Sequence, residues 1–182
     1  LQGNAGNDEM YGSEGTDDIR GNGGDDDLSG GPGNDKLLGG YGNDVVRGAD
    51  GSDVVRGGEG GDKLFASAGN DLLYGGTGGD ELIGGDGNDK VYGQKGFDLV
   101  RGNNGSDEVF GGPGQDTLRG GPGNDLLNGG DGADRAFGND GADTVNSVDG
   151  VADLSQGGDG FDECNVDGID TVRLCEDVTT VS

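Results

Sequence analysis

The chain has 182 residues, of which 47 are glycine, 28% are hydrophobic and none is tryptophan or histidine. Its 37 acidic and 11 basic residues give a formal net charge of −26. So little apolar material and so much like charge exclude a conventional globular core, and composition alone indicates disorder. The acidic charge excludes nucleic-acid binding, and the lack of an apolar run of about eighteen residues excludes a membrane-spanning helix.

The chain lacks the residues that enzymes most often use for catalysis. Histidine, the commonest general base, is absent, so neither Cys164 nor Cys175 has a partner that could activate it. Serine is sparse, and no G-x-S-x-G motif surrounds it. We therefore expect no enzymatic activity within this segment. Because the chain starts at Leu1 inside the repeat described next, we expect a portion of a longer protein, with any catalytic domain upstream.

A nine-residue unit repeats sixteen times from Gly3 to Asn146 without insertion or deletion. Position 4 is glycine and position 6 is aspartate in every unit, and position 8 is always apolar. Position 1 is glycine in every unit but one, where Ala66 stands. The unit therefore reads G-G-x-G-x-D-x-U-x, where U is an apolar residue.

This unit resembles the RTX nonapeptide, the hemolysin-type calcium-binding repeat of secreted bacterial proteins. The resemblance covers residues 3–146 and implies a parallel β-roll, a solenoid whose turns hold Ca²⁺. We expect an RTX calcium-binding β-roll over residues 1–146, followed by degenerate repeats and a C-terminal cap over residues 147–182.

The residues support the same all-β fold independently. Glycines at positions 1, 2 and 4 suit tight turns. Positions 7 to 9 alternate between outward and inward, as a three-residue strand does, and position 8 faces the interior. Two units make one coil, so the repeats predict about eight coils and a length of about 38 Å. A flexible glycine-rich linker would show neither the fixed aspartate nor the fixed aliphatic residue.

The position-6 aspartates should stack on those eighteen residues away, so that Asp89 lies between Asp71 and Asp107. Carboxylates about 4.8 Å apart repel one another strongly unless a cation lies between them. Asx-turn capping explains one aspartate in one turn but not columns of stacked charges. Oxygen ligands without histidine or thiolate favour a hard cation, and Ca²⁺ over Mg²⁺. Seven gaps on each side predict about fourteen ions, whose charge nearly neutralises the chain.

The candidate metal ligands are the position-6 carboxylates and one aspartate of a degenerate repeat. The resemblance implies that carboxylates from two stacked turns hold each ion together with backbone carbonyls of the glycine-rich positions. Calcium binding would then drive folding. The candidate side chains are Asp8, Asp17, Asp26, Asp35, Asp44, Asp53, Asp62, Asp71, Asp80, Asp89, Asp98, Asp107, Asp116, Asp125, Asp134, Asp143 and Asp162. The candidate carbonyls are those of Gly33, Gly42, Gly51, Gly60, Gly78, Gly87, Gly96, Gly105, Gly114, Gly123, Gly132 and Gly141.

One outward surface is predicted to carry large exposed side chains. Tyr74, Tyr92 and Phe110 occupy position 9 of alternate units, and Leu72 lies beside them at position 7. This aromatic face is a candidate surface for a glycan, for a neighbouring domain or for self-association. It is also explained by plain packing between neighbouring strands.

The register breaks after Asn146. Residues 147–156 make a segment one residue too long, and the motif returns at 157–165. We interpret residues 147–182 as degenerate coils that grade into a cap, because the end of a solenoid needs one. Cys164 and Cys175 are predicted to close this cap as a disulfide, the alternative being two small buried apolar residues.

The predicted function is calcium binding by a rigid module of a secreted or cell-surface bacterial protein, which folds on meeting calcium outside the cell. Extracellular location is expected because cytosolic calcium is too scarce for such an array. Two alternatives stay open. One is a glycan-binding or secretion-assisting C-terminal appendage of an upstream enzyme, and the other is a self-assembling component of a surface layer or fibre.

Overall fold

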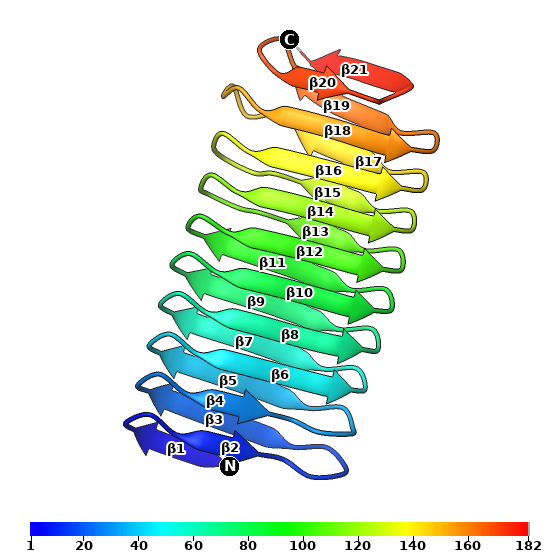
Figure 1. Cartoon of the computed structure of the whole chain (residues 1–182). Coiled ribbons are helices and arrows are strands. Elements are labelled where there is room, and N and C mark those ends of the chain that lie inside the picture. The colour runs from blue at the N-terminus through cyan, green and yellow to red at the C-terminus, as the bar shows by residue number, and fades with distance from the viewer. Residues whose placement is uncertain (182) are drawn as a thin grey trace.

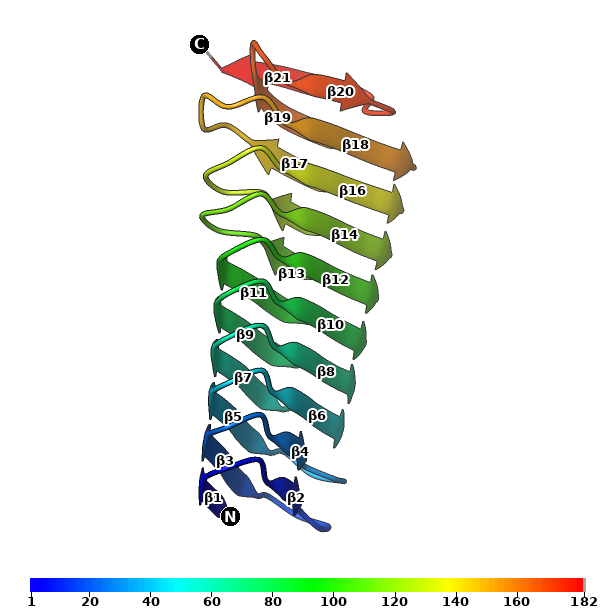
Figure 2. The same cartoon turned by 60° about the vertical axis from the view of Figure 1, so that its left-hand side comes forward.

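The computed structural model describes residues 1–181, which form a two-sided stack of parallel strands (Figures 1 and 2). Successive strands alternate between an eleven-stranded sheet, the odd sheet, and a ten-stranded sheet, the even sheet. The chain climbs the stack steadily, so its two ends lie at opposite ends of the roll (Figure 1). This confirms the predicted parallel β-roll, with about ten turns once the C-terminal coils are included.

Each strand lies beside the strand two further along the chain, which is the order of a solenoid. The odd sheet comprises β1 (Gln2–Ala5), β3 (Asp18–Gly23), β5 (Lys36–Tyr41), β7 (Val54–Glu59), β9 (Leu72–Thr77), β11 (Lys90–Lys95), β13 (Glu108–Phe110), β15 (Leu126–Asn128), β17 (Thr144–Ser147), β19 (Glu163–Asp167) and β21 (Asp177–Val181). The even sheet comprises β2 (Glu9–Tyr11), β4 (Asp27–Ser29), β6 (Val45–Asp50), β8 (Lys63–Ala68), β10 (Glu81–Asp86), β12 (Leu99–Asn104), β14 (Thr117–Pro122), β16 (Arg135–Asp140), β18 (Leu154–Asp159) and β20 (Thr171–Arg173). Residues 1–181 contain no helix that could span a membrane.

The register follows the repeat. In the regular part, partners are eighteen residues apart, as Leu37 on β5 and Val55 on β7 are. The long segment 147–156 shifts this offset to nineteen, so that Arg135 on β16 lies opposite Leu154 on β18. The extra residue falls in the turn between β17 and β18, and the strands therefore keep their inward and outward faces.

Position 8 fills the interior, as predicted. From Ile19 to Val145 these side chains are at most 2% exposed, while Met10 in the first unit is only partly buried. The strands are longer than predicted, because most run over six residues from position 7 to position 3 of the next unit, as β7 does. The glycine at position 1 is therefore an inward-facing strand residue and not part of the turn, which sequence reasoning misjudged.

The C-terminal segment closes the stack with different groups. A disulfide joins Cys164 on β19 to Cys175 in the loop before β21, with Cα atoms 6.0 Å apart. Ser155 takes the place of an aliphatic residue at position 8, and its buried hydroxyl lies 2.7 Å from that of Ser147. The predicted cap extends to Ser182, which lies outside the described residues.

Candidate metal centre

The position-6 aspartates form two columns, one along each edge of the roll where the turns lie. The amide N–H of Asp71 donates to Oδ1 of Asp89, and the N–H of Asp89 donates to Oδ1 of Asp107, both at 2.8 Å. Asp89 is only 1% exposed. It therefore lies between the two aspartates that the repeat spacing indicated, and each carboxylate is pinned through one of its oxygens.

The second carboxylate oxygen, Oδ2, is buried and accepts no hydrogen bond from residues 1–181. Leaving a buried charged acceptor unpaired costs about 1–3 kcal/mol or more, so such atoms are rare in folded proteins. Here the unpaired oxygen recurs through both columns and is a property of the repeat. The aspartates concerned are Asp8, Asp26, Asp35, Asp44, Asp53, Asp62, Asp71, Asp80, Asp89, Asp98, Asp107, Asp116, Asp125, Asp134, Asp143, Asp153 and Asp162.

Glycine at position 1 leaves space for Oδ2 of the position-6 aspartate. A Cβ added to Gly84 would lie 2.3 Å from Asp89 Oδ2 and 2.8 Å from the carbonyl oxygen of Gly102 in the next coil. Both oxygens therefore approach the space that a side chain would occupy. A carboxylate and a carbonyl that face one gap can serve as ligands of a cation.

Glycine at position 4 lets the turns stack closely. Gly87 has a φ of +137°, and a Cβ there would lie 1.5 Å from the carbonyl oxygen of Gly69 in the previous coil. The hydrogen bonds of the turns use other carbonyls, because the N–H of Gly87 donates to Asn104 O at 2.8 Å and that of Lys90 to Asp71 O at 2.9 Å. The position-4 carbonyls, predicted as ligands, thus form a second row of oxygens along each edge.

Burial raises the pKa of the stacked carboxyls. For Asp80, Asp89, Asp116 and Asp125 the pKa rises to about 7, because burial disfavours the charged form; the N–H bond to Oδ1 lowers the pKa, and the neighbouring carboxylates raise it further. In the folded roll without a cation these four carboxyls are therefore partly protonated near neutrality. A bound cation would favour the charged form and release the protons.

The available donors decide which metal fits. The chain has no histidine, and both cysteines are in a disulfide. No three acidic, histidine or cysteine side chains converge on one point within residues 1–181, so carbonyl oxygens would have to supply most of the ligands. An all-oxygen set of about six ligands from flexible turns fits Ca²⁺ better than Mg²⁺, which demands near-ideal octahedral geometry.

The structure adds one aspartate that sequence reasoning missed. The N–H of Asp134 donates to Oδ1 of Asp153 at 2.7 Å, so Asp153 continues the column, nineteen residues later. A ten-residue unit and the polar Ser155 at position 8 hid it, although the spacing of aspartate two residues before position 8 was still present. Asp17 was a candidate ligand from the sequence, but its Oδ2 already accepts a hydrogen bond, from the N–H of Ser13 at 2.9 Å.

Comparison with known families agrees with this geometry. A model of the RTX calcium-binding nonapeptide repeat, in four copies, matches segments that together span residues 1–151. The chain belongs to this family. RTX repeats bind calcium in a β-roll, which makes this chain a structural calcium-binding module. A search of curated proteins found no match. The matched segments are 1–28, 20–55, 29–64, 47–82, 56–91, 83–118 and 119–151.

The aromatic face lies on the odd sheet, and its rings stack on one another. The rings of Tyr74 and Tyr92 stack at 5.2 Å between centroids, and those of Tyr92 and Phe110 at 4.9 Å. The guanidinium of Arg56 lies 5.1 Å from the Tyr74 ring centroid and covers its other side. The inner ring faces are thus occupied, which favours packing between strands, while docking of a glycan or a domain here stays a prediction.

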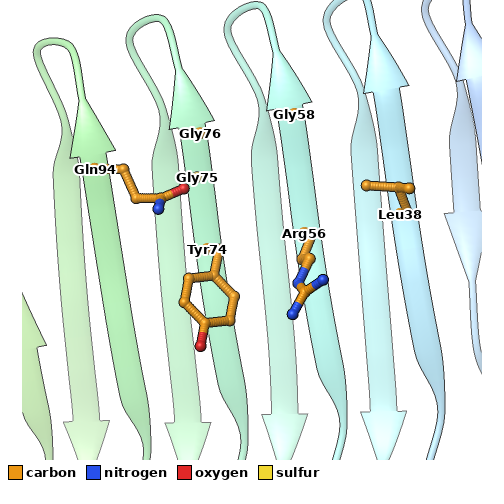
Figure 3. A pocket seen from close by; sticks show the side chains of 7 residues that line it. All are labelled: Leu38, Arg56, Gly58, Tyr74, Gly75, Gly76 and Gln94. Atoms are coloured by element: carbon orange, nitrogen blue, oxygen red, sulfur yellow. The ribbon is translucent and has the colours of Figure 1, made fainter.

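Beside this ladder the odd sheet is hollowed. An open hollow of about 480 Å³ lies over Gly58 and Gly76, where no side chain rises from the sheet. Figure 3 shows Tyr74 and Arg56 side by side on neighbouring strands, with Leu38 beyond Arg56. The hollow is a consequence of glycine at position 2 in two successive coils.

Proposed function

We propose that the two aspartate columns bind Ca²⁺ and that, at a pH where the carboxylates are charged, the RTX array folds only when they do so. The observation that carries the proposal is the set of buried Oδ2 atoms, which no donor within residues 1–181 reaches. Stacked carboxylates repel one another, and a core of one aliphatic side chain per unit offers little to oppose that repulsion. Calcium supplies the missing partner, and the energy of binding it becomes folding energy.

The columns also suggest how many ions the module takes. Between Asp8 and Asp153 on one edge and between Asp17 and Asp162 on the other, sixteen N–H to Oδ1 bonds link successive aspartates, eight on each edge. One ion at each link gives about sixteen sites, slightly more than the fourteen that the regular repeats alone suggest. In this proposal Asp Oδ2 and the carbonyls of positions 1 and 4 would hold each ion.

A pair of charge-matched variants tests the ligand assignment. Asp89→Asn keeps the shape of the side chain but removes charge from the column, so we expect the loss or at least about tenfold weakening of the two adjoining sites. Asp86→Asn removes the same charge from an exposed position-3 residue three positions earlier and should leave the stoichiometry unchanged. Equilibrium dialysis against ⁴⁵Ca²⁺ measures both variants. Equal binding by the two would contradict the assignment.

We also propose that the module works outside the cell. The Cys164–Cys175 disulfide would persist in an oxidising environment, and extracellular calcium sites typically have a Kd of about 10⁻⁴ to 10⁻³ M. Half-maximal folding in that range supports an extracellular role. Half-maximal folding below about 1 μM calcium, at a midpoint that does not change when the disulfide is reduced, would contradict it.

A further inference from the structure

A second surface of the roll is basic, although the chain as a whole is strongly acidic. On the even sheet from β12 to β20, the alternation of buried and exposed residues places positions 7 and 9 on the outer surface. These positions hold four arginines and no acidic residue: Arg101, Arg119, Arg135 and Arg173. We call this surface the arginine face. It is unexpected on a chain with a net charge of −26, because even random placement would bring acids onto it.

The arginines of this face have few internal partners. Arg101 lies 3.7 Å from Glu81 on the neighbouring β10, whereas Arg119, Arg135 and Arg173 form no ion pair within residues 1–181. The guanidinium carbons of Arg119 and Arg135 lie 5.3 and 5.8 Å from the ring centroid of Phe137. Their contact with the ring helps to hold the two cations in place while their N–H groups stay available.

The available cations follow the axis of the roll. In the strand register Arg101 lies opposite Arg119, Arg119 opposite Phe137, Phe137 opposite Gln156, and Gln156 opposite Arg173. Neighbouring strands are about 4.8 Å apart, so Arg101, Arg119, Gln156 and Arg173 present donors along the axis of the roll. Phe137 interrupts this row, and Arg135 lies beside Phe137 on the same strand. A linear ligand with repeated negative charges matches that arrangement.

We propose that the arginine face binds a linear acidic polysaccharide, whose carboxylates pair with Arg119, Arg135 and Arg101. Guanidinium groups bind carboxylates through two parallel hydrogen bonds. The residues between the arginines include Thr117 and Gln156, which can bond to sugar hydroxyls. The binding surface exists only in the folded roll, so binding requires calcium under the proposed function.

Other polyanions fit this surface less well. A lipid surface is best bound by protruding apolar side chains, but Phe137 is only partly exposed and its ring is flanked by two guanidiniums. Single-stranded nucleic acid is held by bases that stack on open aromatic faces, which the same contacts restrict. A second copy of this chain would have to offer a row of acids on a sheet face, and its exposed Asp140 and Asp159, although opposite each other, lie at strand ends.

The test uses the calcium-loaded chain and polygalacturonate, a polymer of uronic acid. The double variant Arg119→Gln/Arg135→Gln is compared with Lys36→Gln/Lys95→Gln, which removes the same charge from exposed residues of the odd sheet that form no ion pair in residues 1–181. Circular dichroism first establishes that both variants fold at the same calcium concentration. Affinity electrophoresis then measures the Kd, and we expect about tenfold weaker binding for the arginine variant alone.

The outcomes separate this proposal from the calcium-driven folding on which it depends. Binding by the wild type that the arginine variant loses and the lysine variant keeps supports the arginine face. Equal affinities for all three folded proteins overturn it, while the calcium proposal stands. Equal binding of neutral dextran, or tighter arginine-dependent binding of single-stranded DNA or phosphatidylglycerol vesicles, also overturns it. Concentration-dependent dimers that the arginine variant abolishes would assign the face to a second copy instead.

Discussion

The regular array, residues 3–146, and the C-terminal segment, residues 147–181, stabilise similar coils with different groups. In the array the position-4 N–H bonds to a backbone carbonyl of the next coil, as Gly123 N–H does to Asp140 O at 2.7 Å. Where the array meets the C-terminal segment, side chains of that segment take over on one edge: Gly132 N–H bonds to Asp149 Oδ2, and Gly150 N–H to Asp167 Oδ2, both at 2.7 Å. On the other edge Gly141 N–H still bonds to the backbone carbonyl of Asp159.

The aspartate columns end on acidic side chains that lie outside the regular spacing. Asp153 N–H donates to Oδ1 of Asp170 at 3.0 Å, and Asp162 N–H donates to Oε2 of Glu176 at 2.9 Å. The disulfide then adds a covalent link that the array lacks. Under the proposed function the array therefore depends on cations and on repetition, whereas the C-terminal segment has local bonds of its own. Calcium dependence should accordingly be strongest in the array.

The largest expected effect comes from pH in calcium-free solution. Burial raises the pKa of Asp80 and Asp89 to about 7 in the fold, well above the value of an exposed carboxyl. A raised folded-state pKa means that protonation stabilises the fold, so this stability is present at low pH and is lost as the pH rises through about 7. With EDTA present, we expect far-UV circular dichroism to show more β-structure at pH 4.5 than at pH 8. More β-structure at pH 8 would contradict this.

With calcium the dependence should reverse. Calcium binds the deprotonated carboxylates, so its apparent affinity should fall as the pH drops below about 7. Calcium titrations at pH 8, 7 and 6 measure this shift. An affinity that rises on acidification would show that the titrating groups are not the calcium ligands.

Glycine substitutions compare the two regions directly. Gly87→Ala places a methyl group 1.5 Å from the carbonyl of Gly69 at a φ of +137°, and should cost about 3 kcal/mol or more of unfolding free energy. Gly150→Ala is the matched change in the C-terminal segment, where φ is +87° and no atom lies within 4 Å, so about 1 kcal/mol is expected. Denaturant unfolding in saturating calcium measures both. Equal costs would show that the close stacking of turns is unimportant.

Removal of the disulfide should act only locally. The double variant Cys164→Ser/Cys175→Ser releases a loop spanning 11 residues. The chain-entropy model assigns such a loop about 3 kcal/mol. Hydrogen exchange in calcium should show faster opening in β19 and β21, with β5 to β13 unchanged. Uniform acceleration through the whole array would mean that the cap and the array unfold as one unit.

The smallest expected effect concerns the serine pair. Ser155→Ala leaves the buried hydroxyl of Ser147 without its partner, which should cost about 1 kcal/mol. Adding Ser147→Ala removes the unpaired group, so the double variant should be no less stable than the single one. Thermal unfolding in calcium compares them. A double variant that is clearly less stable would show that these serines do more than satisfy each other.

The periodicity of the sequence sufficed to predict the two sheets, the inward row at position 8 and the stacking of the aspartates. It did so because each of these follows from a period of nine and from alternation along a strand. The length of the strands was misjudged, because glycine at position 1 was interpreted as a turn residue. Its role is to leave room for a carboxylate, as Gly84 does for Asp89, and that role depends on the folded path of the chain.

The aspartate columns could be predicted wherever the nine-residue motif is intact, which includes Asp162 in the degenerate coils. Asp153 escaped because its unit has one extra residue, which the turn before β18 absorbs without changing the strand faces. The sequence also could not show that Oδ1 accepts a hydrogen bond while Oδ2 has no donor. That difference depends on which oxygen lies next to the N–H of the previous coil.

Circular dichroism during a calcium titration tests the central claim most directly. The chain is first stripped with EDTA at pH 8, where its carboxylates are charged, and calcium is then added. Calcium-driven folding predicts a disordered spectrum that turns cooperatively into that of β-structure, with Mg²⁺ much less effective. A stripped chain that is already rich in β-structure, or a spectrum that calcium leaves unchanged, would contradict it.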